Sequence, residues 1–211
     1  RTITDAENVT VIEPRIATDK TLVSPVGNVQ AGGVVSYTAR FTNTGNSTAY
    51  DVTALDTLAQ GVAYHAGSLA CVNTVGGGVP STATPGAGTV TFDGNPAGSC
   101  DIPAGGFIEC TYTADALPSL LIDGDHTNTV DADWSSQDGA ANAQDRLYND
   151  SVAYPFDGAQ DTDTAVFNVD APLLTKSDGG IGSAAIGQTI SYTLTIDSPL
   201  GTLQDLVVTD T

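Results

Sequence analysis

Basic side chains are scarce in this chain. It carries 6 lysine and arginine residues against 25 aspartates and glutamates, a formal net charge of −19 at pH 7. Proteins that bind nucleic acid displace counterions with clustered Lys and Arg, so this balance excludes nucleic acid as a partner. The same shortage argues against docking on an anionic membrane, and the sequence has no run of about 20 apolar residues that would insert into one.

Helix-forming runs are also missing. The chain has no Met, only three Glu, and no stretch rich in the Ala, Leu, Glu, Lys and Arg that build long helices. Gly and Pro occur 23 and 10 times, among many Thr, Ser, Asn and Asp. This mixture suits short strands joined by turns. Apolar residues make up 40% of the chain, which is enough for a packed core.

Catalytic constellations are absent as well. His65 and His126 are the two histidines, no Cys-x-x-Cys pair occurs, and no Ser or Cys lies beside a plausible base. We therefore predict no catalytic residue, no enzymatic activity and no organic cofactor. Calcium, which takes oxygen ligands, is the one ion left open, with solvated turns as the other explanation of the same carboxylates. The candidate ligands are Asp123, Asp125, Asp157, Asp161 and Asp163.

The chain contains an internal repeat, in which three early segments recur about 155 residues later. These segments are 11–20, which returns as 169–176, 31–38, which returns as 185–193, and 50–57, which returns as 204–211. The spacing predicts a tandem array with three parts. Residues 1–13 form a tail strand of a preceding repeat, 14–168 a complete repeat, and 169–211 the incomplete start of the next.

The incomplete last part has two explanations. About 43 residues cannot close a sandwich core alone. The chain is therefore either cropped from a longer polypeptide or completed by strand donation between neighbouring copies.

Short segments with period-two alternation predict the strands. In the clearest one, 34–43, Val35, Tyr37, Ala39 and Phe41 share one face. The other predicted strands are 49–55, 62–64, 90–92, 107–113, 128–134 and 164–169. So many short strands, without helical periodicity, predict an all-β fold of the Ig-like antiparallel β-sandwich type.

Several of these segments carry a family resemblance. The turn Asn43-Thr44-Gly45-Asn46, the segment Asp56-Thr57-Leu58 and the pair Asn128-Thr129 resemble the DUF11 repeat, an Ig-like sandwich found in tandem in prokaryotic surface and adhesin proteins. The resemblance covers roughly 16–134, and 172–211 in part. Residues 135–165 look like an insertion, and 197–201 depart from the Asn-Thr-Gly turn.

The resemblance to surface Ig-like modules implies a self-formed Lys–Asn isopeptide bond. In such modules a first-strand lysine attacks an Asn amide on a late strand, helped by a buried acid whose surroundings neutralise both groups. The matching positions here are Lys20, Asn128 and Asp56, and the repeat supplies the equivalents Lys176 and Asp210. Lys20 as a solvated edge-strand charge is the alternative.

The three cysteines allow more than one pairing. An exported, acidic domain favours a disulfide, and the related repeats imply Cys71–Cys100, with Cys100–Cys110 as competitor.

Taken together, these features predict a structural module of an extracellular tandem-repeat protein or filament: a stalk, spacer or cell-surface assembly unit. Its expected partners are adjacent repeats or neighbouring copies of itself. A ligand-binding adhesin module that recognises glycan or protein is the alternative, and a contiguous exposed aromatic patch would favour it.

Overall fold

The structure is a computed structural model of the chain. It describes residues 7–25, 29, 32–74, 78–86, 88–118, 120, 124–139, 144–149, 161–169, 171–198 and 206–210. No helix long and apolar enough to cross a membrane occurs among them.

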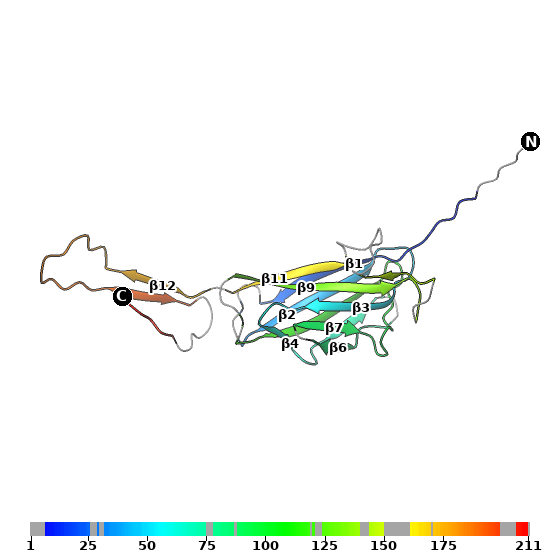
Figure 1. Ribbon diagram of the computed structural model, residues 1–211, viewed down its shortest axis with the longest axis horizontal. Coiled ribbons are helices and arrows are strands. Elements are labelled where there is room, and N and C mark those ends of the chain that lie inside the picture. The colour runs from blue at the N-terminus through cyan, green and yellow to red at the C-terminus, as the bar shows by residue number, and fades with distance from the viewer. Residues whose placement is uncertain are drawn as a thin grey trace, which may run out of the picture.

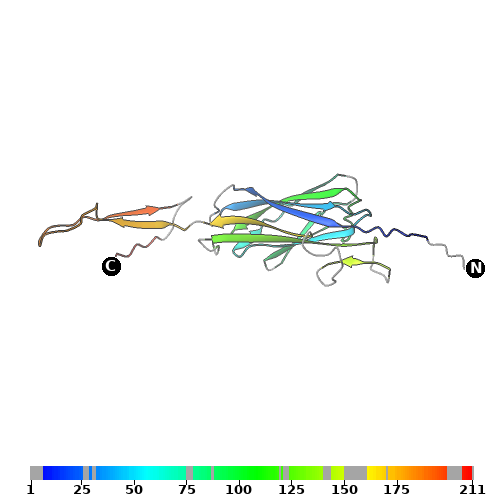
Figure 2. The ribbon, with the colours of Figure 1, turned by 90° about the horizontal axis from the view of Figure 1, so that it is seen from above.

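Two antiparallel sheets pack face to face (Figures 1 and 2). The first sheet has the order β1 (Ile16–Ser24), β2 (Val34–Asn43), β8 (Phe107–Ala116) and β4 (Val62–Tyr64), and β5 (Ala70–Asn73) also pairs with β8. The second has the order β10 (Leu147–Tyr148), β9 (Gly124–Ser135), β3 (Tyr50–Thr57), β7 (Thr89–Asp93) and β6 (Thr82–Pro85), and β11 (Thr162–Val169) also pairs with β9. The predicted Ig-like antiparallel β-sandwich is confirmed.

The core lies between the sheets and follows the period-two pattern. In β2 the predicted inward residues Val35, Tyr37, Ala39 and Phe41 are all buried. Tyr37 lies opposite Tyr112 of β8 in the strand register, and their ring centroids are 5.4 Å apart. Burying each such large side chain contributes about 1.5–3 kcal/mol to the stability of the fold. Burial of these inward side chains is therefore the main interaction that holds the two sheets together.

The predicted strands are present, and among the strands that alternation did not predict the shortest are β5, β6 and β10. β5, β6 and β10 are 4, 4 and 2 residues long. Segments this short carry too few alternating positions to stand out from loops. β10 depends on a tertiary contact, because its Tyr148 ring stacks on Trp134 of β9 at 5.1 Å.

A separate hairpin, β12 (Leu173–Ser177) and β13 (Thr193–Asp197), extends from one end of the sandwich, while residues 7–15 leave at the other (Figure 1). Lys176 lies opposite Leu194, just as Lys20 of β1 lies opposite Ala39 of β2. The hairpin thus pairs as the first two strands of the sandwich do. The division of the chain into three parts stays a prediction.

Candidate functional site

A cluster of buried polar side chains lies between the two sheets. Lys20 of β1 and Tyr112 of β8 come from the first sheet, and Asp56 of β3 and Asn128 of β9 from the second. Lys20 is 3% exposed and Asp56 and Asn128 are 0% exposed. Each occupies an inward position of its strand, where the pleat directs the side chain into the core.

These four side chains form one hydrogen-bonded group. The Lys20 ammonium contacts an Asp56 carboxylate oxygen in a fully buried ion pair. Lys20 Nζ also lies 2.5 Å from the Tyr112 hydroxyl. That hydroxyl donates to Asp56 Oδ2 and accepts from Asn128 Nδ2 at 3.2 Å. The structure therefore brings together Lys20, Asp56 and Asn128, the residues predicted to form the isopeptide bond. All three contact the Tyr112 hydroxyl.

Aromatic rings wall this group off from water. Lys20 Nζ lies 4.9 Å from the Tyr37 ring centroid and 5.1 Å from that of Tyr112. The Phe92 ring packs 5.0 Å from Tyr112. Such a low-dielectric setting strengthens electrostatic interactions and penalises any unpaired charge.

Burial shifts the pKa values of the acid and the amine in opposite directions. It lowers the pKa of the Lys20 amine, although the charge and hydrogen bond of Asp56 oppose the shift. It raises the pKa of the Asp56 carboxyl against the effects of Lys20, Tyr112 and Asn128. Both shifts favour the neutral forms, and an uncharged amine is the form that acts as a nucleophile.

The cluster also contains polar atoms without partners. Among the described residues, Asp56 Oδ1, Asn128 Oδ1 and the Tyr37 hydroxyl are buried and have no hydrogen-bond partner. Leaving such atoms unpaired costs roughly 1–3 kcal/mol each. Buried unpaired polar atoms of this kind are found most often at functional sites.

Tyr112 is the member of the cluster that sequence reasoning missed. The alternation of its strand shows only that it points inward with Ile108 and Cys110. Nothing in that pattern indicates which polar groups lie opposite it.

The hairpin repeats part of this cluster. Lys176 Nζ lies 2.5 Å from Asp210 Oδ1 and 4.5 Å from the Tyr192 ring centroid. The side chains of Lys176 and Asp210 are 39% and 51% exposed. Lys176 thus contacts Asp210 as Lys20 contacts Asp56, but the pair in the hairpin is exposed whereas the pair in the sandwich is buried.

The predicted cysteine pairings are wrong. The structure joins Cys71 to Cys110 and leaves Cys100 buried with a free thiol. The reason is the missed strand β5, whose pairing with β8 places Cys71 directly opposite Cys110, with the Cα atoms 4.0 Å apart. Cys100 instead points into the core from the loop between β7 and β8, where burial raises its pKa to about 12.

The calcium candidates that the structure describes do not converge. Asp123 and Asp157 lie outside the described residues. Asp125 lies opposite Asn168 at one end of the β9–β11 ladder, whereas Asp163 lies opposite Val130 nearer the other end and accepts a hydrogen bond from the Lys20 amide at 2.7 Å. Asp161 is buried beside Asp163. No group of three or more metal-ligating side chains occurs in the described part of the chain.

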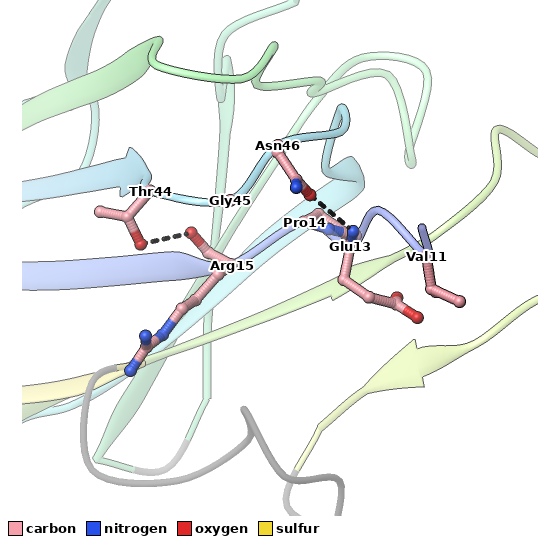
Figure 3. Close-up of a pocket in the computed structure, with 7 residues that line it drawn as sticks. All are labelled: Val11, Glu13, Pro14, Arg15, Thr44, Gly45 and Asn46. Atoms are coloured by element: carbon pink, nitrogen blue, oxygen red, sulfur yellow. Dashed lines mark hydrogen bonds between the residues drawn. The ribbon is translucent and has the colours of Figure 1, made fainter. Parts of the chain in front are cut away.

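The chain enters the sandwich through a tightly held junction. Figure 3 shows Val11 to Arg15 against the turn Thr44-Gly45-Asn46, around a cavity of about 270 Å³. The Glu13 amide donates to Asn46 Oδ1 at 2.9 Å, and the Asn46 amide donates to the Glu13 carbonyl at 3.0 Å. The approach is so close that a Cβ on Gly45 would lie 2.5 Å from the Arg15 nitrogen.

Two residues of the insertion make further contacts with this junction. The Glu13 carboxylate contacts Arg146 through one oxygen and the Tyr148 hydroxyl through the other. Both partners belong to the segment 135–165 that sequence comparison sets apart as an insertion. Backbone and side chain of Glu13 are therefore both fixed to the sandwich.

Comparison with known proteins yields distant structural neighbours only. No protein-family model matches the chain, and no curated protein matches it. The major pilin subunit BcpA of Bacillus cereus aligns with a TM-score of 0.46 at 10% identity, over 78% of this chain and 42% of that one. The pilus protein RrgB of Streptococcus pneumoniae aligns at 0.44 and 16%, over 59% and 23%. The collagen-binding domain of a Staphylococcus aureus adhesin aligns at 0.40 and 11%, over 76% and 99%.

The chain thus spans less than half the length of these two pilin structures. Similarities this distant do not assign a function.

Proposed function

We propose that this chain is a structural module of an extracellular surface protein or filament, and that a Lys20–Asn128 amide bond locks its two sheets together. The observation that carries the proposal is the buried cluster of Lys20, Asp56 and Asn128, which joins opposite sheets inside an aromatic cage. A covalent link at this point ties β1 to β9. It resists separation of the sheets, which a load-bearing module requires.

The reaction needs only groups that are already present. A proton passes from the Lys20 ammonium to the Asp56 carboxylate, which leaves a neutral amine and a neutral acid. The amine attacks the side-chain carbonyl carbon of Asn128, the bond from that carbon to Nδ2 breaks, and ammonia leaves. Asp56 acts as the acid and base for both proton movements. Because the ionised pair and the neutral pair hold the same number of protons, we expect a rate that is constant between the two apparent pKa values of the pair.

The entry junction supports a spacer role. Glu13 is held by two backbone hydrogen bonds to Asn46 and by two side-chain contacts. Whatever precedes Glu13 therefore leaves the sandwich in a set direction. A stiff junction of this kind keeps successive modules in line, whereas a loose one lets them swing.

Composition and family resemblance favour a location of this protein at the cell surface. A net charge of −19 keeps such a module soluble and repels nucleic acid, and a disulfide persists in an oxidising environment. The resemblance to the DUF11 repeat supports a tandem array with adjacent repeats as partners.

The adhesin alternative receives less support from the surface. Among the described residues, Tyr192 is the single aromatic side chain in the set of strongly exposed large apolar residues, and Trp134 is 2% exposed. No contiguous aromatic face for stacking a sugar is therefore visible in that part of the chain.

Intact mass tests the proposal directly. After reduction of the Cys71–Cys110 disulfide, the purified chain is expected to weigh less than its sequence by one ammonia, and fragmentation should join the peptides that contain Lys20 and Asn128. Lys20→Ala should restore the full mass. Lys176→Ala, which removes the equivalent lysine of the exposed hairpin, is the matched control and should leave the link intact. A wild-type chain of full sequence mass would refute the cross-link.

A further inference from the structure

The Tyr112 hydroxyl touches every polar member of the buried cluster. It lies 2.5 Å from Lys20 Nζ and accepts from Asn128 Nδ2 at 3.2 Å. It also donates to the same Asp56 oxygen that contacts Lys20. A phenol has one donor and two acceptor sites, and the three contacts use all of them.

Tyr37 shows that this arrangement is specific to one hydroxyl. Both rings face Lys20 at similar distances, 4.9 Å for Tyr37 and 5.1 Å for Tyr112. Yet in the described part of the chain the Tyr37 hydroxyl has no hydrogen-bond partner. The two rings share the task of excluding water, whereas the Tyr112 oxygen also makes hydrogen bonds to both the acid and the amide.

We infer that Tyr112 is a catalytic residue of the cross-linking reaction and carries a proton from Asp56 to Asn128 Nδ2, the nitrogen that leaves as ammonia. This inference rests on the cross-link proposed above. It assigns the protonation of the leaving nitrogen to Tyr112, because Asn128 Nδ2 makes its 3.2 Å hydrogen bond to the Tyr112 oxygen.

The step balances as follows. Neutral Lys20 attacks the Asn128 side-chain carbon, which gives a tetrahedral centre with a positive nitrogen from lysine and a negative oxygen. Protonated Asp56 gives its proton to the Tyr112 oxygen while Tyr112 gives its own to Nδ2. The lysine nitrogen returns a proton to Asp56, the bond from carbon to Nδ2 breaks with its electron pair on nitrogen, and ammonia departs.

The two transfers through Tyr112 must occur together. Burial and the adjacent Asp56 raise the pKa of the Tyr112 hydroxyl far above its ordinary value, so a free tyrosinate does not form. A relay in which the oxygen gains one proton as it loses another avoids that charge. The same raised pKa keeps the hydroxyl protonated, and therefore able to donate, at neutral pH.

The test follows bond formation in time. Wild-type chain and Tyr112→Phe are made by cell-free synthesis, quenched in acid at intervals, and weighed for loss of ammonia. Loss of a positioned proton donor is expected to slow the reaction by roughly 100-fold or more. The wild-type rate should also fall in heavy water, and this isotope effect should shrink in the variant, which a purely structural role of Tyr112 would not cause.

Tyr64→Phe is the matched control. The Tyr64 ring lies 6.2 Å from that of Tyr112, but its hydroxyl accepts from the Leu69 amide outside the cluster, so this variant should react at the wild-type rate. If Tyr112→Phe also reacts at the wild-type rate, the relay is refuted and the cross-link stands. If the wild-type chain never loses ammonia, the cross-link itself fails.

A second variant covers the case in which Tyr112→Phe does not fold. Fluorotyrosine placed at position 112 alone keeps the ring and hydroxyl but makes the phenol more acidic. The rate of ammonia loss should then change from that of the wild-type chain, while the circular dichroism spectrum stays the same. An unchanged rate would overturn the relay.

Discussion

Replacing Asn128 by alanine should prevent the proposed cross-link and leave Lys20 as an amine that pairs with Asp56. On the chain-entropy model, a link that closes a loop of roughly 100 residues stabilises by about 4.7 kcal/mol. We expect the free energy of unfolding to fall by about 4–5 kcal/mol.

This loss is large enough to measure in two ways. Urea unfolding followed by circular dichroism should show a lower midpoint with the disulfide intact in both proteins. In a domain of this size about 1 kcal/mol corresponds to a shift of 2–4 °C in Tm, so the thermal midpoint should fall by roughly 10–20 °C.

A double-mutant cycle separates the covalent bond from packing. Lys20→Met removes the other end of the link and keeps an apolar stem in the core. If both single substitutions break the same bond, the double variant loses the bond once, and the two effects fall short of additivity by about 4–5 kcal/mol. Additive losses, or an Asn128→Ala variant as stable as the wild type, would refute the reasoning.

Three further predictions concern other parts of the chain. Gly45→Ala should cost roughly 1–3 kcal/mol and speed amide exchange at Arg15, whose nitrogen lies 2.5 Å from the added Cβ; unchanged exchange would contradict the close approach. Cys100, which is 0% exposed and whose pKa is raised to about 12, should resist iodoacetamide at neutral pH until the chain unfolds, and labelling of the folded protein would show otherwise. Asp51→Asn should stabilise at neutral pH. Burial raises the pKa of Asp51, so the folded state binds its proton more tightly and wild-type stability falls as pH rises through that pKa; the gain should therefore fade in acid, and a gain that is constant with pH would argue against it.

The strands that the sequence predicts are those with several inward positions. β2 matches its predicted range of 34–43, because four alternating apolar residues separate its two faces. β10 has two residues and exists through the stacking of Tyr148 on Trp134. Contacts of that kind depend on residues that the chain brings together only after the sheets have formed.

The residues of the candidate site were also predictable only in part. The family resemblance singles out Lys20, Asp56 and Asn128, although Asp56 lies just beyond the predicted strand 49–55. The central position of Tyr112 was not predictable, since alternation shows which face a side chain takes but not which residue of another strand it meets. That choice depends on register and on how the two sheets are packed.

The sequence by itself therefore determined the fold class, the scarcity of basic groups, and the inward residues of β2. Those properties are local, because they follow from composition and from the two-residue period of a strand. Only the tertiary structure decided that Cys71 pairs with Cys110, that Arg146 and Tyr148 hold Glu13, and that one phenol joins the acid to the amide. Each of these contacts joins residues at least 39 positions apart along the chain, or passes between sheets. Their geometry is set by the packing of the whole core rather than by any single segment.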